Sequence, residues 1–90
     1  MKNIKVAFHP NAYLKYVKNV KSGLRTRTKI LEILERDSST ASHLAIKIRL
    51  SYSAILHHLR LLEGEEIITR KGSRPYHWVL TGLGQKRLVF

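Results

Sequence analysis

The chain has 90 residues and a mass of 10.4 kDa, so it can form one small domain around a single core. Its 17 Lys and Arg residues outnumber its 6 Asp and Glu residues, and the resulting net charge of +11 indicates a polyanionic partner. The absence of cysteine excludes disulfides, thiolate metal sites and cysteine catalysis. No apolar run approaches the ~20 residues that span a membrane, and the N-terminus lacks a secretory apolar core. We therefore expect a cytoplasmic, nucleoid-associated protein.

The acidic residues are confined to two short stretches, residues 32–37 and 63–66. Residues 1–29 carry eight basic residues and no acidic one, and residues 67–90 carry five basic residues and no acidic one. One interpretation of this charge distribution is a solvent-exposed surface that is basic but binds no partner. The size and the segregation of the charge favour a surface that faces a phosphate backbone.

The N-terminal 24 residues are expected to form an extension to the main domain. Alternating apolar residues predict a short strand over residues 2–8. An apolar stripe then predicts an amphipathic helix over residues 11–20, ending near Ser22 and Gly23. The stripe consists of Tyr13, Val17 and Val20. Such a stripe either completes the core or pairs with a second copy of the chain. Alternatively, Lys15, Lys18 and Lys21 extend a phosphate footprint.

Three further helices are predicted between residues 26 and 62. Thr26 or Thr28 can cap the first, Thr40 the second and Ser51 the third, because their hydroxyls can bond to free amides of the first turn. A tight link at Arg49 and Leu50 joins the last two helices. The expected core stripes are Ile30, Leu31 and Leu34, with Ile33 beside them; Ala41, Leu44, Ala45 and Ile48; and Ile55, Leu59 and Leu62.

After Gly64 the apolar period changes from helical to two. Two β-rich runs, residues 67–70 and 76–80, are separated by a five-residue loop with Gly72 and Pro75, which predicts a hairpin. Residues 85–90 add a last helical turn or two. The predicted fold is mainly α with a small β-hairpin, a winged helix-turn-helix (α+β) over residues 25–90 with a strand and helix before it.

This fold predicts a recognition helix over residues 52–62, called the reading helix below, that enters the major groove and is braced by the preceding helix. The hairpin is the wing, and its residues 70–75 reach the backbone or the minor groove. With Ile55 at the centre of the buried face, about 100° per residue puts Ser53, His57 and Arg60 on the opposite side. Tyr76 and Trp78 alternate on the second strand, and Trp78 is expected in the core. The predicted DNA-binding residues are Lys47 and Arg49 before the helix, Tyr52, Ser53, Leu56, His57 and Arg60 on it, and Arg70, Lys71 and Arg74 at the hairpin tip.

The run LAIKIRLSYSAILHHLRLL, residues 44–62, resembles the ArsR-type winged-helix repressors. Their pattern there is roughly LA-x-x-L-G-L-S followed by V-S-x-H-L-x-x-L, and the match needs no gap. Residues 30–34 resemble the family's first helix, and residues 80–84 resemble its LT-x-x-G ending. The resemblance covers residues 25–88 and implies a DNA-binding transcription regulator. The broader MarR-like and archaeal winged-helix regulators share most of this pattern.

Three residues depart from the family pattern. Arg49 replaces a Gly of the turn, and because non-Gly residues rarely adopt a positive φ, it predicts a turn of different shape. Leu56 replaces a Ser and offers an apolar contact to a thymine methyl group instead of a hydrogen bond. Glu66 replaces the Gly that leads into the wing, with Gly64 as the expected helix stop.

No constellation in the sequence supports an enzyme, a metal site or a cofactor site. The histidines at 9, 43, 57, 58 and 77 form no pair at the spacing of one helical turn and have no suitably spaced carboxylate. His58 is expected to be half-buried and structural, with or without a phosphate contact. Glu63, Glu65 and Glu66 are expected to be a solvated helix end. No small-molecule effector is evident.

The leading hypothesis is a sequence-specific, homodimeric transcription regulator that binds double-stranded DNA. A nucleoid-type architectural protein with low sequence specificity is the alternative, and a winged helix that docks onto protein is a third. The expected reading face is the side of the reading helix that carries Tyr52, Ser53, Leu56, His57 and Arg60. Its mixture of Tyr, Ser, Leu and His favours the first hypothesis, because a protein that only coats DNA would carry more Lys and Arg there. A docking domain would have a weak basic face, unlike this chain.

Overall fold

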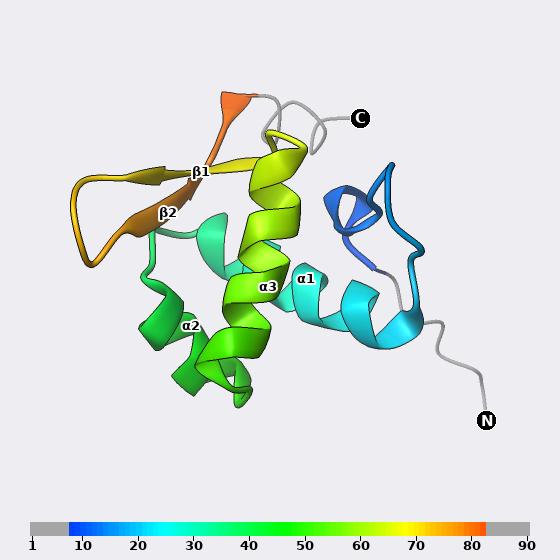
Figure 1. Cartoon of the computed structure of the whole chain (residues 1–90), viewed down its shortest axis with the longest axis horizontal. Coiled ribbons are helices and arrows are strands. Elements are labelled where there is room, and N and C mark those ends of the chain that lie inside the picture. The colour runs from blue at the N-terminus through cyan, green and yellow to red at the C-terminus, as the bar shows by residue number, and fades with distance from the viewer. Residues whose placement is uncertain (1–7, 83–90) are drawn as a thin grey trace.

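The computed structural model describes residues 8–82. The elements follow in the order η1 (Pro10–Ala12), α1 (Lys21–Leu34), α2 (Ala41–Ile48), α3 (Tyr52–Gly64), β1 (Ile68–Lys71) and β2 (His77–Leu80) (Figure 1). Three helices and an antiparallel hairpin confirm the predicted winged helix-turn-helix. The predicted strand over residues 2–8, except Phe8, and the predicted turn over 85–90 lie outside the described residues.

The helix predicted over residues 11–20 is wrong. After the 3-10 turn η1, residues 13–20 form an irregular segment, which we name the extension loop. The Asn19 side chain bonds twice to the backbone of Leu14: Oδ1 accepts the Leu14 amide at 2.8 Å, and Nδ2 donates to the Leu14 carbonyl at 2.9 Å. These bonds replace helical hydrogen bonds. Leu14 is buried, whereas Tyr13 and Val20 of the predicted stripe are about half exposed.

The start of α1 also differs from the prediction, because Ser22 and Gly23 lie in its first turn and do not end a helix. Neither expected threonine is the N-cap. The Thr28 hydroxyl accepts the His9 amide, and the Thr26 hydroxyl donates to the Ser22 carbonyl. Gly23 permits a close approach here: a Cβ on it would lie 2.8 Å from Nη1 of Arg27.

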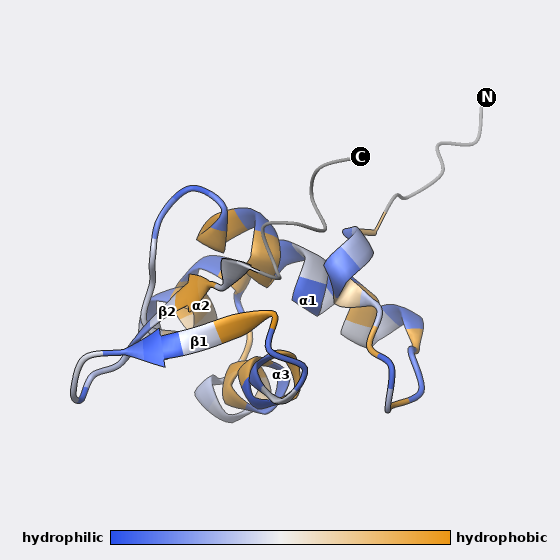
Figure 2. Ribbon diagram, turned by 90° about the horizontal axis from the view of Figure 1, so that it is seen from above, coloured by the Kyte–Doolittle hydropathy of each residue, from blue (hydrophilic) through white to orange (hydrophobic). Residues whose placement is uncertain are grey.

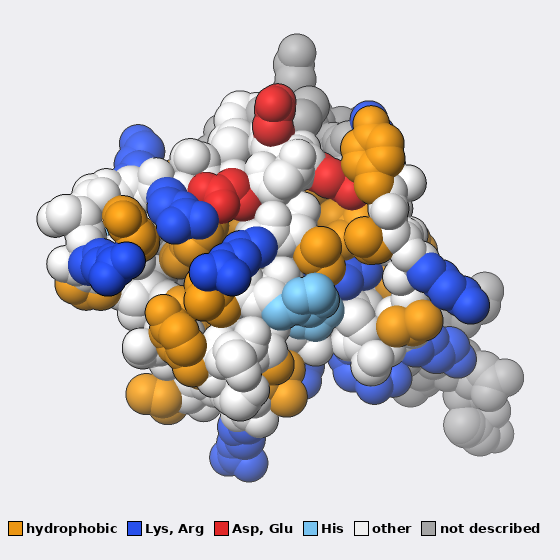
Figure 3. Space-filling view, viewed as in Figure 1, with side chains coloured by type: hydrophobic (Ala, Val, Ile, Leu, Met, Phe, Trp, Pro, Cys, Tyr) orange, Lys and Arg blue, Asp and Glu red, His pale blue; other side chains and the backbone are white. Residues whose placement is uncertain are grey.

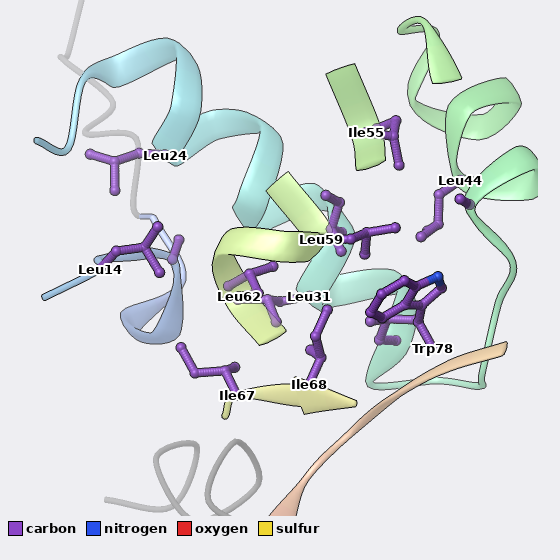
Figure 4. Close-up of a cluster of buried hydrophobic side chains, with 14 residues drawn as sticks. Leu14, Leu24, Leu31, Leu44, Ile55, Leu59, Leu62, Ile67, Ile68 and Trp78 are labelled. Atoms are coloured by element: carbon purple, nitrogen blue, oxygen red, sulfur yellow. The ribbon is translucent and has the colours of Figure 1, made fainter. Parts of the chain in front are cut away.

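The predicted core is confirmed around α3. Ile55, Leu59 and Leu62 are fully buried and pack with apolar residues of every other described helix and of the hairpin (Figure 4). The other predicted members in this cluster are Ile30, Leu31, Leu34, Ala41, Leu44 and Trp78, while Ile33, Ala45 and Ile48 are partly buried against it. Leu14 brings the extension loop into the same core. Helix α3 is thus fixed along one side by its own apolar stripe.

The α2–α3 turn is built from local signals. Thr40 caps α2 by accepting the His43 amide at 3.1 Å, and Ser51 caps α3 by accepting the Ala54 amide at 3.1 Å, as predicted. Arg49 has φ 67° and ψ 45°, the left-handed conformation that usually favours glycine. The expectation of a different turn shape is therefore wrong. Arg49 adopts a conformation that costs a non-glycine residue roughly 1–2 kcal/mol.

The hairpin joins the core at its base and is hydrophilic at its tip (Figure 2). Ile68 pairs with Leu80 and Lys71 with His77. The buried Trp78 also exchanges backbone hydrogen bonds with Ser39, which ties β2 to the segment before α2. Gly64 is the last residue of α3, and Glu66 adopts the left-handed conformation, φ 63°, that lets the chain turn into β1.

Among the described residues, no helix is long and apolar enough to cross a membrane.

Candidate nucleic-acid interface

The outward side of α3 presents the predicted reading residues together. Ile55 and Leu59 anchor the inward side, so Ser53, His57 and Arg60 are exposed on the other. Tyr52 is 53% exposed at the start of the helix, and Leu56 is half-buried beside it. Seen along its axis in Figure 2, α3 lies at the outer edge of the molecule. The helix can therefore approach a surface without obstruction from α1 or α2.

Basic residues surround this side of α3. Lys47 and Arg49 are exposed at the end of α2 and in the turn, and Lys71 and Arg74 are exposed on the wing. In Figure 3, Lys and Arg side chains lie on both sides of the histidine side chains near the centre of the face. Positive charge on both flanks of a protruding helix matches the two phosphate backbones that border a DNA groove.

A groove separates α3 from the wing. Its residues from α3 are Tyr52, Leu56 and Arg60, and those from the hairpin include Arg70, Arg74, Pro75, Tyr76 and Trp78. The sequence did not single out Pro75 or Tyr76 as groove residues. The alternation of Tyr76 and Trp78 places both on the same side of β2, which is the one sequence signal that could have identified Tyr76.

Arg70, predicted at the end of the first strand and close to the hairpin tip, makes a contact with α3 that the sequence did not predict. It lies within β1, and its guanidinium makes a two-point ion pair with Glu63 of α3, with Nε–Oε2 and Nη2–Oε1 distances of 3.0 and 2.8 Å. The guanidinium also stacks over the rings of Tyr76 and Trp78, 5.1 and 4.8 Å from their centroids. The hydrogen bonds from Arg70 hold the pKa of Glu63 below its usual range. This cluster fixes the wing relative to α3.

His58 is half-buried, as expected, and faces the extension instead of the open side of α3. Its Nδ1 lies 3.2 Å from Nη1 of the buried Arg27. A guanidinium only donates, so Nδ1 accepts and the ring proton resides on Nε2. Burial, followed by the charges of Arg27 and His57, lowers the pKa of His58 to about 4. His58 is therefore neutral near pH 7 and links α3 to the extension.

The geometry described above is that of a known family of regulators. The sequence pattern of the bacterial regulatory proteins of the arsR family matches residues 25–70, just over half of the chain. The chain belongs to the arsR family. Family and fold are those of DNA-binding transcription regulators, not enzymes. A search of curated protein sequences gives no match to this chain.

Solved structures similar to this arsR-family chain include regulators and a DNA complex. A possible transcriptional regulator for arsenical resistance is 28% identical, with a TM-score of 0.64 over 71% of this chain and 68% of that one. Wild-type ZitR of Lactococcus lactis is 29% identical, with a TM-score of 0.64 over 81% of this chain and 48% of ZitR. This chain thus spans about half the length of ZitR. The Zalpha domain of Carassius auratus PKZ, solved with Z-DNA, is 26% identical, with a TM-score of 0.60 over 63% of this chain and 94% of that one.

Proposed function

We propose that this arsR-family chain is a sequence-specific regulator that binds double-stranded DNA as a homodimer. Residues 52–62 of α3 lie in the major groove, and the wing, residues 70–75, lies along the backbone or in the minor groove. The observation that carries the proposal is the exposed outer side of α3, which shares a groove with the wing and is bordered by positive charge. The similarity to a domain solved with Z-DNA supports a nucleic-acid duplex as the partner.

The residue types on α3 favour sequence reading over non-specific coating. Ser53 and His57 carry hydrogen-bonding groups for base edges, and Tyr52 and Leu56 offer apolar surface to thymine methyl groups. Arg60 is the only cation among these five residues, where a coating protein would place several. Of the remaining predicted residues, Lys47, Arg49, Lys71 and Arg74 contact phosphates of the DNA backbone. Arg70 holds the wing in position.

Selection of bound sequences from a random pool of duplexes tests this proposal. We expect recovery of a defined motif that the protein prefers over random DNA by about 10³-fold or more. Recovery of unrelated sequences, all bound with equal affinity, would instead support the architectural alternative. Loss of binding to every duplex would contradict both.

A further inference from the structure

The extension loop, residues 13–20, is the basic segment for which the proposed reading face leaves no role. It precedes the residues that match the family, 25–70. Lys15 and Lys18 lie in the loop, Lys21 follows as the first residue of α1, and all three are exposed. No acidic residue occurs anywhere between positions 8 and 31. The charged side chains of the loop itself are therefore all positive.

The loop is held firmly against the body of the protein. The Glu65 carboxylate accepts the backbone amides of Lys15 at 2.7 Å and Tyr16 at 3.3 Å. Arg27, only 2% exposed, donates to the Ala12 carbonyl at 2.7 Å and to Oδ1 of Asn19 at 3.1 Å. A loop fixed in this way pays little additional ordering entropy when it binds a partner.

The loop and the wing lie on opposite sides of α3, as Figure 1 and Figure 2 both show. On the wing side, the groove is lined by Tyr52, Leu56 and Arg60 of α3. On the other side, a second groove is lined by Ala54, His57 and Leu61 of α3 and by Val17, Lys18 and Val20 of the extension loop. His57 of the reading face thus lies across one groove from Lys18.

The charge on the loop favours DNA over a second copy of the chain as its occupant. Within residues 8–82 the contacts between a basic side chain and a carboxylate are His9–Glu35 and Arg70–Glu63, so none of the three lysines is paired with a carboxylate. A two-fold dimer contact through the loop would bring identical lysine-bearing surfaces together, which is unfavourable. The Tyr16 side chain, 84% exposed, adds a hydroxyl that can donate to a phosphate.

We propose that the extension loop is a second phosphate-binding element, which contacts the DNA strand across the major groove from the strand that the wing contacts. This inference rests on the proposed function and deepens it. With α3 in a groove about 12 Å wide, backbone lies on both sides of the helix, and the loop and the wing each face one of them. Lys18, with Lys21 beside it, supplies the charge.

The test compares Lys18→Ala with Arg36→Ala in the full chain, because each removes one exposed positive charge. Arg36 lines grooves to which α3 contributes no residue, so it serves as the matched control. We expect Lys18→Ala to weaken binding about five-fold on any duplex at about 150 mM salt and to reduce the slope of log K against log salt by about 0.9. Arg36→Ala should leave this slope unchanged.

Hydroxyl-radical footprinting locates the contact. In the wild-type complex we expect backbone protection on both sides of the major groove, and in the Lys18→Ala/Lys21→Ala complex loss of protection on the side away from the wing. Equal slopes for Lys18→Ala and Arg36→Ala, while Arg74→Ala lowers the slope, would overturn the loop inference and leave the proposed function intact. A Lys18→Ala protein that keeps its slope but sediments as a smaller species would make the loop a dimer element and also overturn it. Absence of wild-type DNA binding would overturn the proposed function itself.

Discussion

Arg27 and His58 show how a charged residue becomes part of the interior. Burial lowers the pKa of Arg27, and its hydrogen bonds to Ala12, Asn19 and His58 satisfy the guanidinium in place of water. Burial, and after it the charge of the same guanidinium, lowers the pKa of His58 and so disfavours its protonation. This pair of residues joins the extension to α3, so protonation of His58 affects the contact between them.

The lowered pKa of His58 predicts that the free energy of unfolding decreases as the pH is lowered. Unfolding returns the pKa to its ordinary 6.5 from about 4, so below pH 6.5 the unfolded chain binds the additional proton and is favoured. We expect the stability that this group contributes above pH 6.5 to be lost as the pH falls through about 4. Because the ring is only half-buried, the loss is discounted to about 1 kcal/mol.

Urea unfolding at about pH 7.5 and about pH 4.5 measures this difference. His58→Asn keeps an acceptor near Nδ1 but cannot titrate, so its stability should change less between the two pH values. His43→Asn, which removes an exposed histidine of α2, is the control and should follow the wild type. Equal pH dependence in wild type and His58→Asn would show that His58 is not the responsible group.

At the scale of elements, the wing is fixed to α3 by the two-point contact between Arg70 and Glu63. We expect Glu63→Gln to weaken DNA binding about two- to five-fold, because the wing loses its fixed position, even though the substitution removes a negative charge. Affinity measurements on one duplex test this. The exchange Glu63→Arg with Arg70→Glu keeps the net charge and should restore part of the loss. Tighter binding by Glu63→Gln would indicate that Arg70 is a phosphate contact that Glu63 holds back.

The elements that the sequence predicted well are those whose signals are local. Thr40 and Ser51 cap the helices that follow them, and the apolar stripe of α3 follows its own helical period. The helix predicted for the extension was wrong because the conformation there depends on two contacts without a sequence signal. Asn19 bonds back to Leu14, and Glu65, fifty residues away along the chain, accepts the Lys15 amide. The Arg70–Glu63 contact was missed for the same reason: a turn of the chain separates the two residues, and no periodicity connects them.

At the scale of the whole molecule, a net charge of +11 predicts strong dependence of DNA binding on salt. If the protein neutralises roughly 6–10 phosphates, affinity should fall about 10³–10⁵-fold between about 50 and 200 mM salt, because bound counterions are released on association. Titrations of one duplex across this range measure the slope. A nearly constant affinity would contradict an electrostatic interface.

The proposed homodimer predicts a symmetric binding site. Two copies related by a two-fold axis place their reading helices in successive major grooves, so the site should be an inverted repeat with half-sites about 34 Å apart. Analytical ultracentrifugation at about ten to a hundred micromolar protein should show a species of twice the monomer mass. A single 10.4 kDa species, with a selected site that lacks symmetry, would contradict the dimer.

The central claim, that the outer side of α3 reads sequence, is tested most directly by the ratio of affinity for the selected site to affinity for random DNA. Ser53→Ala and His57→Ala should each cost about 1–3 kcal/mol on the selected site and little on random DNA, so the ratio falls. Because both side chains are exposed, the free energy of unfolding should change by less than about 0.5 kcal/mol. Arg74→Ala should lower both affinities equally and keep the ratio. An unchanged ratio in Ser53→Ala and His57→Ala would contradict the assignment of α3 as the reading helix.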